Sequence, residues 1–217
     1  MKNKFLFVLI TTTSFLFSAS CNQHTSDENT SSTDTVSTNT TSQSADSSAG
    51  TDQYGGFKSQ VQWGAHLVQV IGCNDCHTPK KMTAMGPVPD TSLLLSGHPA
   101  KMPAPDVNRK EMESKGLAVT NDLTSWVGPW GISYAANLTS DGTGIGNWQY
   151  PQFERAIRQG KFMGSENGRQ LLPPMPWQDF ASMTDGELKA IFAYLKSVKP
   201  VHNLVPDAQP PVSAPTH

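Results

Sequence analysis

The sequence predicts an all-α fold, a small helical domain that carries one long irregular insertion. Three segments place apolar residues at helical spacing, and no set of segments alternates as a group of strands does. We expect helices over residues 60–71, 151–160 and 184–199, and a folded domain over residues 55–205. We expect the insertion over residues 78–134, which is rich in Pro, Gly and Met and shows little sustained periodicity.

The first predicted helix has a glycine in the middle of its apolar face. Val61, Ala65 and Val68 recur on this face, and Gly64 lies between them. Glycine weakens a helix, so its presence here indicates that a second helix crosses closely at this point.

The other two predicted helices have clear boundaries. The second begins with Pro151 in its first turn and ends at Gly160. The third begins at Thr184, which forms a capping-box pattern with Glu187, and it stops before Pro200.

The amino terminus has the pattern of an export signal. Lys2 and Lys4 precede a short apolar run, and threonines interrupt this run, so it is too short to span a bilayer comfortably. We therefore predict a signal peptide over residues 1–20, with a short uncleaved anchor as the alternative.

Cys21 follows three small residues, in an arrangement that resembles the lipobox of bacterial lipoproteins. Among the three cysteines of the chain it has no thiol partner if the other two are used elsewhere, and a free thiol is a liability in an oxidising compartment. We predict that Cys21 carries a lipid; a free cysteine after simple cleavage is the alternative.

The regions on either side of the domain are predicted to be flexible. Residues 21–54 are mostly Ser, Thr, Asn and Asp, which cannot bury enough apolar surface to offset their ordering entropy, so they form a tether. Residues 206–217 are rich in Pro and Ala and are predicted to be a flexible tail. The formal net charge is −2, and nothing suggests the basic face that nucleic acid requires.

The central motif is Cys73-Asn-Asp-Cys76-His77, which has the Cys-x-x-Cys-His spacing of c-type haem attachment. Two thiols three positions apart on one helical turn can each add to a haem vinyl group, while His77 points at the iron from the same side. A structural zinc site would need further ligands, and a dithiol redox site would need a βαβ context that the helical pattern denies. The motif predicts one covalently bound haem c, with His77 as the proximal ligand.

The best candidate for the second axial ligand is Met175. It lies in a segment with three prolines, which fix φ and hold the chain extended, so a stiff backbone presents the thioether. Most methionines fill gaps in a core, and this remains the alternative for Met175. The other possible ligands are Met163, Met183, the group Met82, Met85 and Met102, and His98.

These motifs support a family resemblance over about residues 60–205. The haem motif, Gly86-Pro87, the proline-flanked Met175 and the final amphipathic helix resemble class I cytochromes c. The closer resemblance is to one haem module of the cytochrome subunits of alcohol and gluconate dehydrogenases, although those subunits usually carry three haem motifs. The segments that carry this resemblance are Ala136-Asn-Leu-Thr-Ser-Asp141, Gly144-Ile-Gly-Asn-Trp148, Phe153-Glu-Arg-Ala-Ile-Arg158, Pro174-Met-Pro-Trp177 and Leu188-Lys-Ala-Ile-Phe-Ala-Tyr-Leu195.

The resemblance implies a cytochrome c-like fold and further roles for individual residues. Pro87, or alternatively Pro89, would supply the carbonyl that accepts a hydrogen bond from His77. Gly64 would lie where the first and last helices cross, near Tyr194. Three residues are candidates for contacting the haem propionates, with ordinary packing as the alternative: Trp177, Tyr150 and Arg169.

A haem bound by His77 and Met175 has no open position for a substrate, so we expect a one-electron carrier rather than an enzyme. Its expected location is the periplasm or the outer face of a bacterial membrane, where a lipid anchors it. Its expected partners are a redox donor and acceptor, such as a dehydrogenase and a terminal oxidase. The alternative is a haem enzyme or gas-binding protein in which the insertion forms an open distal pocket.

Overall fold

The computed structural model describes residues 52–213, and regular structure begins at Asp52, three residues before the predicted start of the domain. The predicted signal peptide, Cys21, nearly all of the predicted tether and the last four residues of the predicted tail lie outside these residues. Within residues 52–213, no helix is both long enough and apolar enough to cross a membrane.

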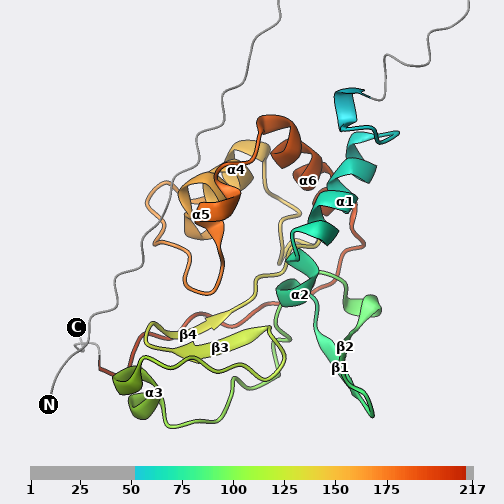
Figure 1. The fold of residues 1–217 in the computed structure, drawn as a ribbon. Helices are drawn as coiled ribbons and strands as arrows, with labels where there is room; N and C mark the ends of the chain where they lie inside the picture. Colours follow the sequence, from blue (N-terminus) through green and yellow to red (C-terminus); the bar gives the residue numbers. More distant parts are fainter. Residues whose placement is uncertain (1–51, 214–217) are drawn as a thin grey trace, which may run out of the picture. The chain divides into compact units, whose positions relative to one another are not determined.

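The described residues form six α-helices and two antiparallel hairpins (Figure 1). The helices are α1 (Gln60–Val70), α2 (Cys73–His77), α3 (Arg109–Lys115), α4 (Tyr150–Gln159), α5 (Trp177–Phe180) and α6 (Asp185–Ser197). The first hairpin pairs β1 (Lys80–Thr83) with β2 (Gly86–Pro89), and the second pairs β3 (Ser125–Gly128) with β4 (Gly131–Tyr134). Three short 3-10 helices complete the set: η1 (Asp52–Tyr54), η2 (Thr91–Leu93) and η3 (Phe162–Gly164).

The all-α prediction is wrong, because the insertion folds into the two hairpins as well as α3. Each strand has only four residues, too few to produce a sustained alternation in the sequence. Every residue of β3 is buried, so no polar face marks it as a strand. β3 and β4 also pair outside their hairpin, with Val119 and Gln209 respectively, and no local pattern predicts such distant partners. The fold is therefore mixed, with a helical core and a β-containing insertion.

The three predicted helices are confirmed as α1, α4 and α6, with ends that differ by at most two residues. The capping box is present: Glu187 N donates to Thr184 Oγ1, and Thr184 N donates to the Glu187 carboxylate at 2.8 Å. Gly160 ends α4 in the left-handed region, with φ of 63°.

The hydrophobic core lies mainly between α1, α4 and α6. Its buried members are Val68, Leu95, Ile145, Phe153, Leu188, Ile191, Leu195 and Val198. The predicted close crossing is confirmed: a Cβ at Gly64 would overlap the carbonyl oxygen of Ala190 on α6 and press on Tyr194 Cβ. Only glycine lets the two backbones approach this closely (Figure 1).

Within residues 206–213, the described part of the predicted tail forms hydrogen bonds with the insertion. Gln209 exchanges two backbone hydrogen bonds with Ile132 of β4, at 2.9 and 3.0 Å. The Glu113 carboxylate of α3 accepts hydrogen bonds from the backbone N–H groups of Val212 and Ser213, at 2.7 and 3.1 Å. Composition suggested a free tail, but these long-range hydrogen bonds give the backbone fixed partners.

Candidate functional site

The two cysteines and the histidine of the motif all lie on the short helix α2. Gly72 separates α1 from α2 and adopts φ of 77°, a left-handed conformation that lets the chain turn sharply into the motif. Cys73 and Cys76 are three positions apart, so they project from neighbouring points on one helical turn. Both are free, half-buried thiols. The turn at Gly72 therefore places two reduced thiols next to His77.

Burial keeps both thiols protonated at neutral pH. It raises the pKa of Cys73 to about 12, and it also raises the pKa of Cys76, where Lys80 opposes the effect. A protonated thiol is a poor metal ligand, because the thiolate is the form that binds metals. A metal ion bound by this pair would therefore have to displace both thiol protons.

His77 is held in one tautomer by a backbone carbonyl. Its Nδ1 lies 2.7 Å from the carbonyl oxygen of Ala136. A carbonyl can only accept, so Nδ1 carries the proton and Nε2 keeps its lone pair. Burial lowers the pKa of His77, which favours the neutral ring, although the hydrogen bond to Ala136 opposes this effect. This is the orientation that an imidazole needs in order to bind iron through Nε2.

The carbonyl partner of His77 is not the one that the family pattern implied. Pro87 and Pro89 both lie in β2, on an exposed hairpin, and neither accepts the hydrogen bond from His77 Nδ1. Ala136 follows β4 and lies 59 positions away from His77 in the sequence. A backbone carbonyl therefore orients His77 as expected, but a residue just after the insertion supplies it.

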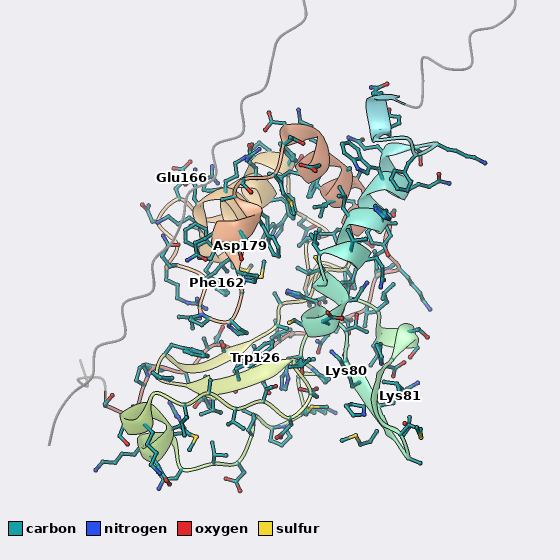
Figure 2. The ribbon with its side chains drawn as sticks, viewed as in Figure 1. Lys80, Lys81, Trp126, Phe162, Glu166 and Asp179 are labelled. Carbon is teal, nitrogen blue, oxygen red and sulfur yellow. The ribbon has the colours of Figure 1, made fainter. Side chains whose placement is uncertain are left out.

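Sequence reasoning missed Lys80, which lies directly beside the haem motif (Figure 2). Its Nζ donates to the carbonyl oxygens of Asp75 and Thr78, the latter at 2.7 Å, so it caps the carboxyl end of α2. Burial lowers the pKa of Lys80. The sequence did contain a signal for this role. A lysine just after a short helix can donate to the free carbonyl groups at the helix end.

Met175 lies in the loop of residues 171–176, between η3 and α5, and its side chain is half-buried. The segment is not extended as predicted. Instead, Met175 N donates to Leu172 O at 3.3 Å and closes a turn through the prolines. Ser133 Oγ of β4 donates to Pro173 O at 2.6 Å and ties this loop to the insertion. The loop is therefore closed at Met175 by its own turn and held at Pro173 by the insertion.

The other possible axial ligands are less available. His98 is fully buried, and both of its ring nitrogens have partners, Thr124 Oγ1 and Met102 O, each at 2.8 Å. Met183 packs against the core. Met82 and Met85 are exposed on the first hairpin by 77% and 93%, and Met163 is 51% exposed. Met175 combines partial burial with a braced backbone, and this combination favours it.

The three candidate propionate contacts lie in different settings. Trp177 begins α5 and packs against Gly160 at the end of α4. The Arg169 guanidinium lies 3.9 Å from the centroid of the Phe162 ring, which Figure 2 labels. Its Nη1 donates to Gln170 O at 2.9 Å.

Tyr150 carries the observation that points most directly to a missing polar partner. Its hydroxyl is buried, yet it has no hydrogen-bond partner among the described residues. Burial raises the pKa of Tyr150, so the hydroxyl remains a donor at neutral pH. Buried donors are nearly always satisfied, so a polar group of a bound cofactor is a suitable partner. This hydroxyl, the two free thiols and the available His77 Nε2 fit a covalently attached haem.

Comparison with known proteins gives an independent line of evidence. The chain is 42% identical over 82 residues to one subunit of the nicotinate dehydrogenase of Pseudomonas putida. It is 39% identical over 89 residues to the cytochrome c subunit of a quinone alcohol dehydrogenase from Gluconacetobacter polyoxogenes. It is 38% identical over 82 residues to the cytochrome c subunit of gluconate 2-dehydrogenase from Pantoea cypripedii. The predicted resemblance to one module of such cytochrome subunits is confirmed.

Each alignment covers only part of this chain and part of the related protein. The aligned residues make up 37–40% of this chain, but only 7% of the nicotinate dehydrogenase subunit and 17–18% of the other two subunits. No family model matches the chain. The likeness thus concerns one module of these larger proteins.

Proposed function

We propose that this protein is a one-electron carrier with a single haem c, bound covalently through Cys73 and Cys76. The observation that carries the proposal is the arrangement on α2, where two free thiols directly precede His77 and the carbonyl of Ala136 leaves His77 Nε2 available. The likeness to cytochrome c subunits supports the same cofactor.

The chemistry of attachment uses both thiols in reduced form. The S–H groups of Cys73 and Cys76 would each add across one vinyl double bond, forming a carbon–sulfur bond while the thiol proton goes to the other vinyl carbon. No electron acceptor is needed, because the addition is not an oxidation. A disulfide between the cysteines would block this reaction, and both cysteines are free.

We propose that His77 and Met175 would bind the haem iron. The haem iron, when bound, supplies a couple between Fe(III) and Fe(II), and a thioether ligand raises its potential relative to a second histidine. With both positions filled, the protein has no site on the metal for a substrate. His77 keeps its proton on Nδ1 throughout, so electron transfer requires no proton movement at this residue.

Tyr150, Arg169 and Trp177 are proposed to contact the propionate side of the cofactor. The buried Tyr150 hydroxyl would donate to a carboxylate, and it is the best supported of the three. Arg169 uses one guanidinium nitrogen for Gln170 O, and no hydrogen bond is found for its other nitrogens within residues 52–213.

The proposed setting is outside the cytoplasm, at the membrane. The sequence of residues 1–21 supports export followed by lipid attachment at Cys21, and the Ser/Thr-rich segment after it supports a tethered domain. The names of the relatives support a dehydrogenase as the electron donor. A terminal oxidase is the proposed acceptor.

The proposal is tested by replacing the methionine ligand. The wild-type protein should be low-spin and six-coordinate, with a weak near-infrared band from sulfur bound to ferric iron. Met175→Ala should keep its haem, because the thioethers do not depend on Met175. It should also lose the band, gain high-spin character and have a lower reduction potential.

Met163→Ala is the matched control, because it makes the same change at a half-exposed methionine of the same region. It should leave the band and the potential unchanged. If Met175→Ala keeps both, Met175 is not the ligand. A wild-type spectrum that is high-spin and five-coordinate would instead support the haem enzyme or gas-binding alternative.

A further inference from the structure

A short stretch at the boundary of the insertion contacts both His77 and the loop that carries Met175. Ser133 of β4 donates to Pro173 O, two residues before Met175, at 2.6 Å. Three residues after Ser133, the carbonyl of Ala136 accepts the hydrogen bond from His77 Nδ1 at 2.7 Å. The stretch of residues 133–136 therefore lies against the proximal histidine and against the methionine loop.

The hydrogen bond from Ser133 to the loop has a fixed direction. Trp130 Nε1 lies 3.0 Å from Ser133 Oγ, and an indole N–H can only donate. Ser133 Oγ therefore accepts from Trp130, and its own proton goes to Pro173 O. A hydroxyl that accepts one hydrogen bond becomes a stronger donor in the next, so Trp130 strengthens the contact to the loop.

The strand that carries Ser133 is held on both edges. Ser133 is opposite Trp126 in the hairpin register, and the neighbouring Ile132 pairs with Val127 on one side and Gln209 on the other. Ser133 is only 7% exposed, so water has little access to replace it as a donor. A rigid, shielded donor can hold a loop in one position.

We propose that Ser133, oriented by Trp130, is a positioning residue that keeps the loop of residues 171–176 closed so that Met175 stays on the haem iron. This inference rests on the proposed His77 and Met175 ligation. The insertion then has a defined role, which is to set how easily another ligand displaces the methionine. Displacement requires the loop to open, and opening breaks the hydrogen bond from Ser133.

The test is a titration of the ferric holoprotein with imidazole. Loss of the near-infrared sulfur band reports how much methionine has been displaced. Ser133→Ala should bind imidazole about 2- to 12-fold more tightly, which corresponds to the net worth of one hydrogen bond. Trp130→Phe keeps a ring but loses the N–H donor, and it should show a smaller change in the same direction. Ser133→Thr keeps the hydroxyl and should stay within about twofold of the wild type.

Ser140→Ala is the matched control. Ser140 Oγ also donates to a distant carbonyl, Val198 O, at 2.7 Å, but the loop of residues 171–176 makes no part of this contact. Ser140→Ala should destabilise the fold about as much as Ser133→Ala does, and it should leave the imidazole affinity unchanged. If Ser133→Ala and Trp130→Phe both match Ser140→Ala, the positioning role is overturned.

This result is separable from failure of the proposed ligation. If Met175→Ala removes the band and the serine variants have no effect, the ligation stands and the inference about Ser133 falls. If the wild type has no sulfur band, the ligation fails first, and the inference falls with it.

Discussion

Lys80 lies directly beside the motif of Cys73, Cys76 and His77 and carries a positive charge there. Its ammonium caps the end of α2, and its charge acts on Cys76. A cation held in this place, partly screened from water by burial, should favour the reduced form of a cofactor attached to α2. Lys81 is its neighbour, but it is 62% exposed and is paired with Asp90 at 2.9 Å.

Lys80→Met should therefore lower the reduction potential. The expected decrease is on the order of 20–60 mV, because a single charge at partial burial contributes roughly 0.5–1.4 kcal/mol. Lys81→Met is the matched control and should change the potential by much less, since its charge is solvated and already paired with Asp90. Protein-film voltammetry gives both values. Equal shifts in the two variants would show that Lys80 has no special effect.

At the scale of the elements, α3 connects the insertion to the end of the described chain. Arg109 donates to Gln209 Oε1 at 3.2 Å, and Glu113 accepts from Val212 and Ser213. Burial opposes ionisation of Glu113, but the hydrogen bonds from Val212 and Ser213 outweigh it, so the pKa of Glu113 is lowered from 4.5. The Glu113 carboxylate holds Val212 and Ser213 at the end of the described chain. Their attachment to α3 should therefore depend on pH.

The direction of this pH dependence follows from the lowered pKa. The ionised form stabilises the contact at pH values above 4.5, and the contribution is lost as the pH falls through the lower folded-state value. The amide NMR signals of Val212 and Ser213 should therefore shift on acidification below pH 4.5. Glu113→Gln should remove this transition.

Glu111→Gln is the control for the Glu113 experiment. Glu111 lies on the same helix, but it pairs with Lys115 at 2.5 Å instead of the C-terminal segment. The acid transition of Val212 should persist in this variant. A transition that survives in Glu113→Gln would assign the pH dependence to another group.

For the whole molecule, the proposed lipid and tether decide where the cytochrome domain can work. A disordered chain reaches about 5–6 Å × √n, so the tether would let the domain move tens of ångströms from the membrane. Deleting residues 25–48 should slow electron flow to a membrane-bound partner without changing the spectrum of the domain. The measurement is the rate of haem reduction by a membrane fraction, and an unchanged rate would contradict the proposed reach.

The intact mass of the membrane-extracted protein checks the anchor itself. A mature chain that begins at a diacylglycerol-modified Cys21 is expected. An unmodified Cys21 in a protein that does not partition with membranes would contradict lipid attachment.

The local features of this protein could be predicted from short stretches of sequence. The chemistry of Cys73, Cys76 and His77 depends on their spacing along one helical turn, and the capping box at Thr184 depends on four consecutive residues. Periodicity over a few turns was enough to predict α1, α4 and α6, and the glycine within α1 indicated the close crossing with α6.

The distant groups that support the site became known only from the folded chain. The partner of His77 is the backbone carbonyl of Ala136, and the loop before Met175 is held through the carbonyl of Pro173. The C-terminal segment pairs with β4 through the backbone of Gln209. Every residue carries the same carbonyl, so no residue type marks which one is used. Which carbonyl each donor reaches depends on how the folded chain brings distant segments together. A local sequence pattern does not contain this information.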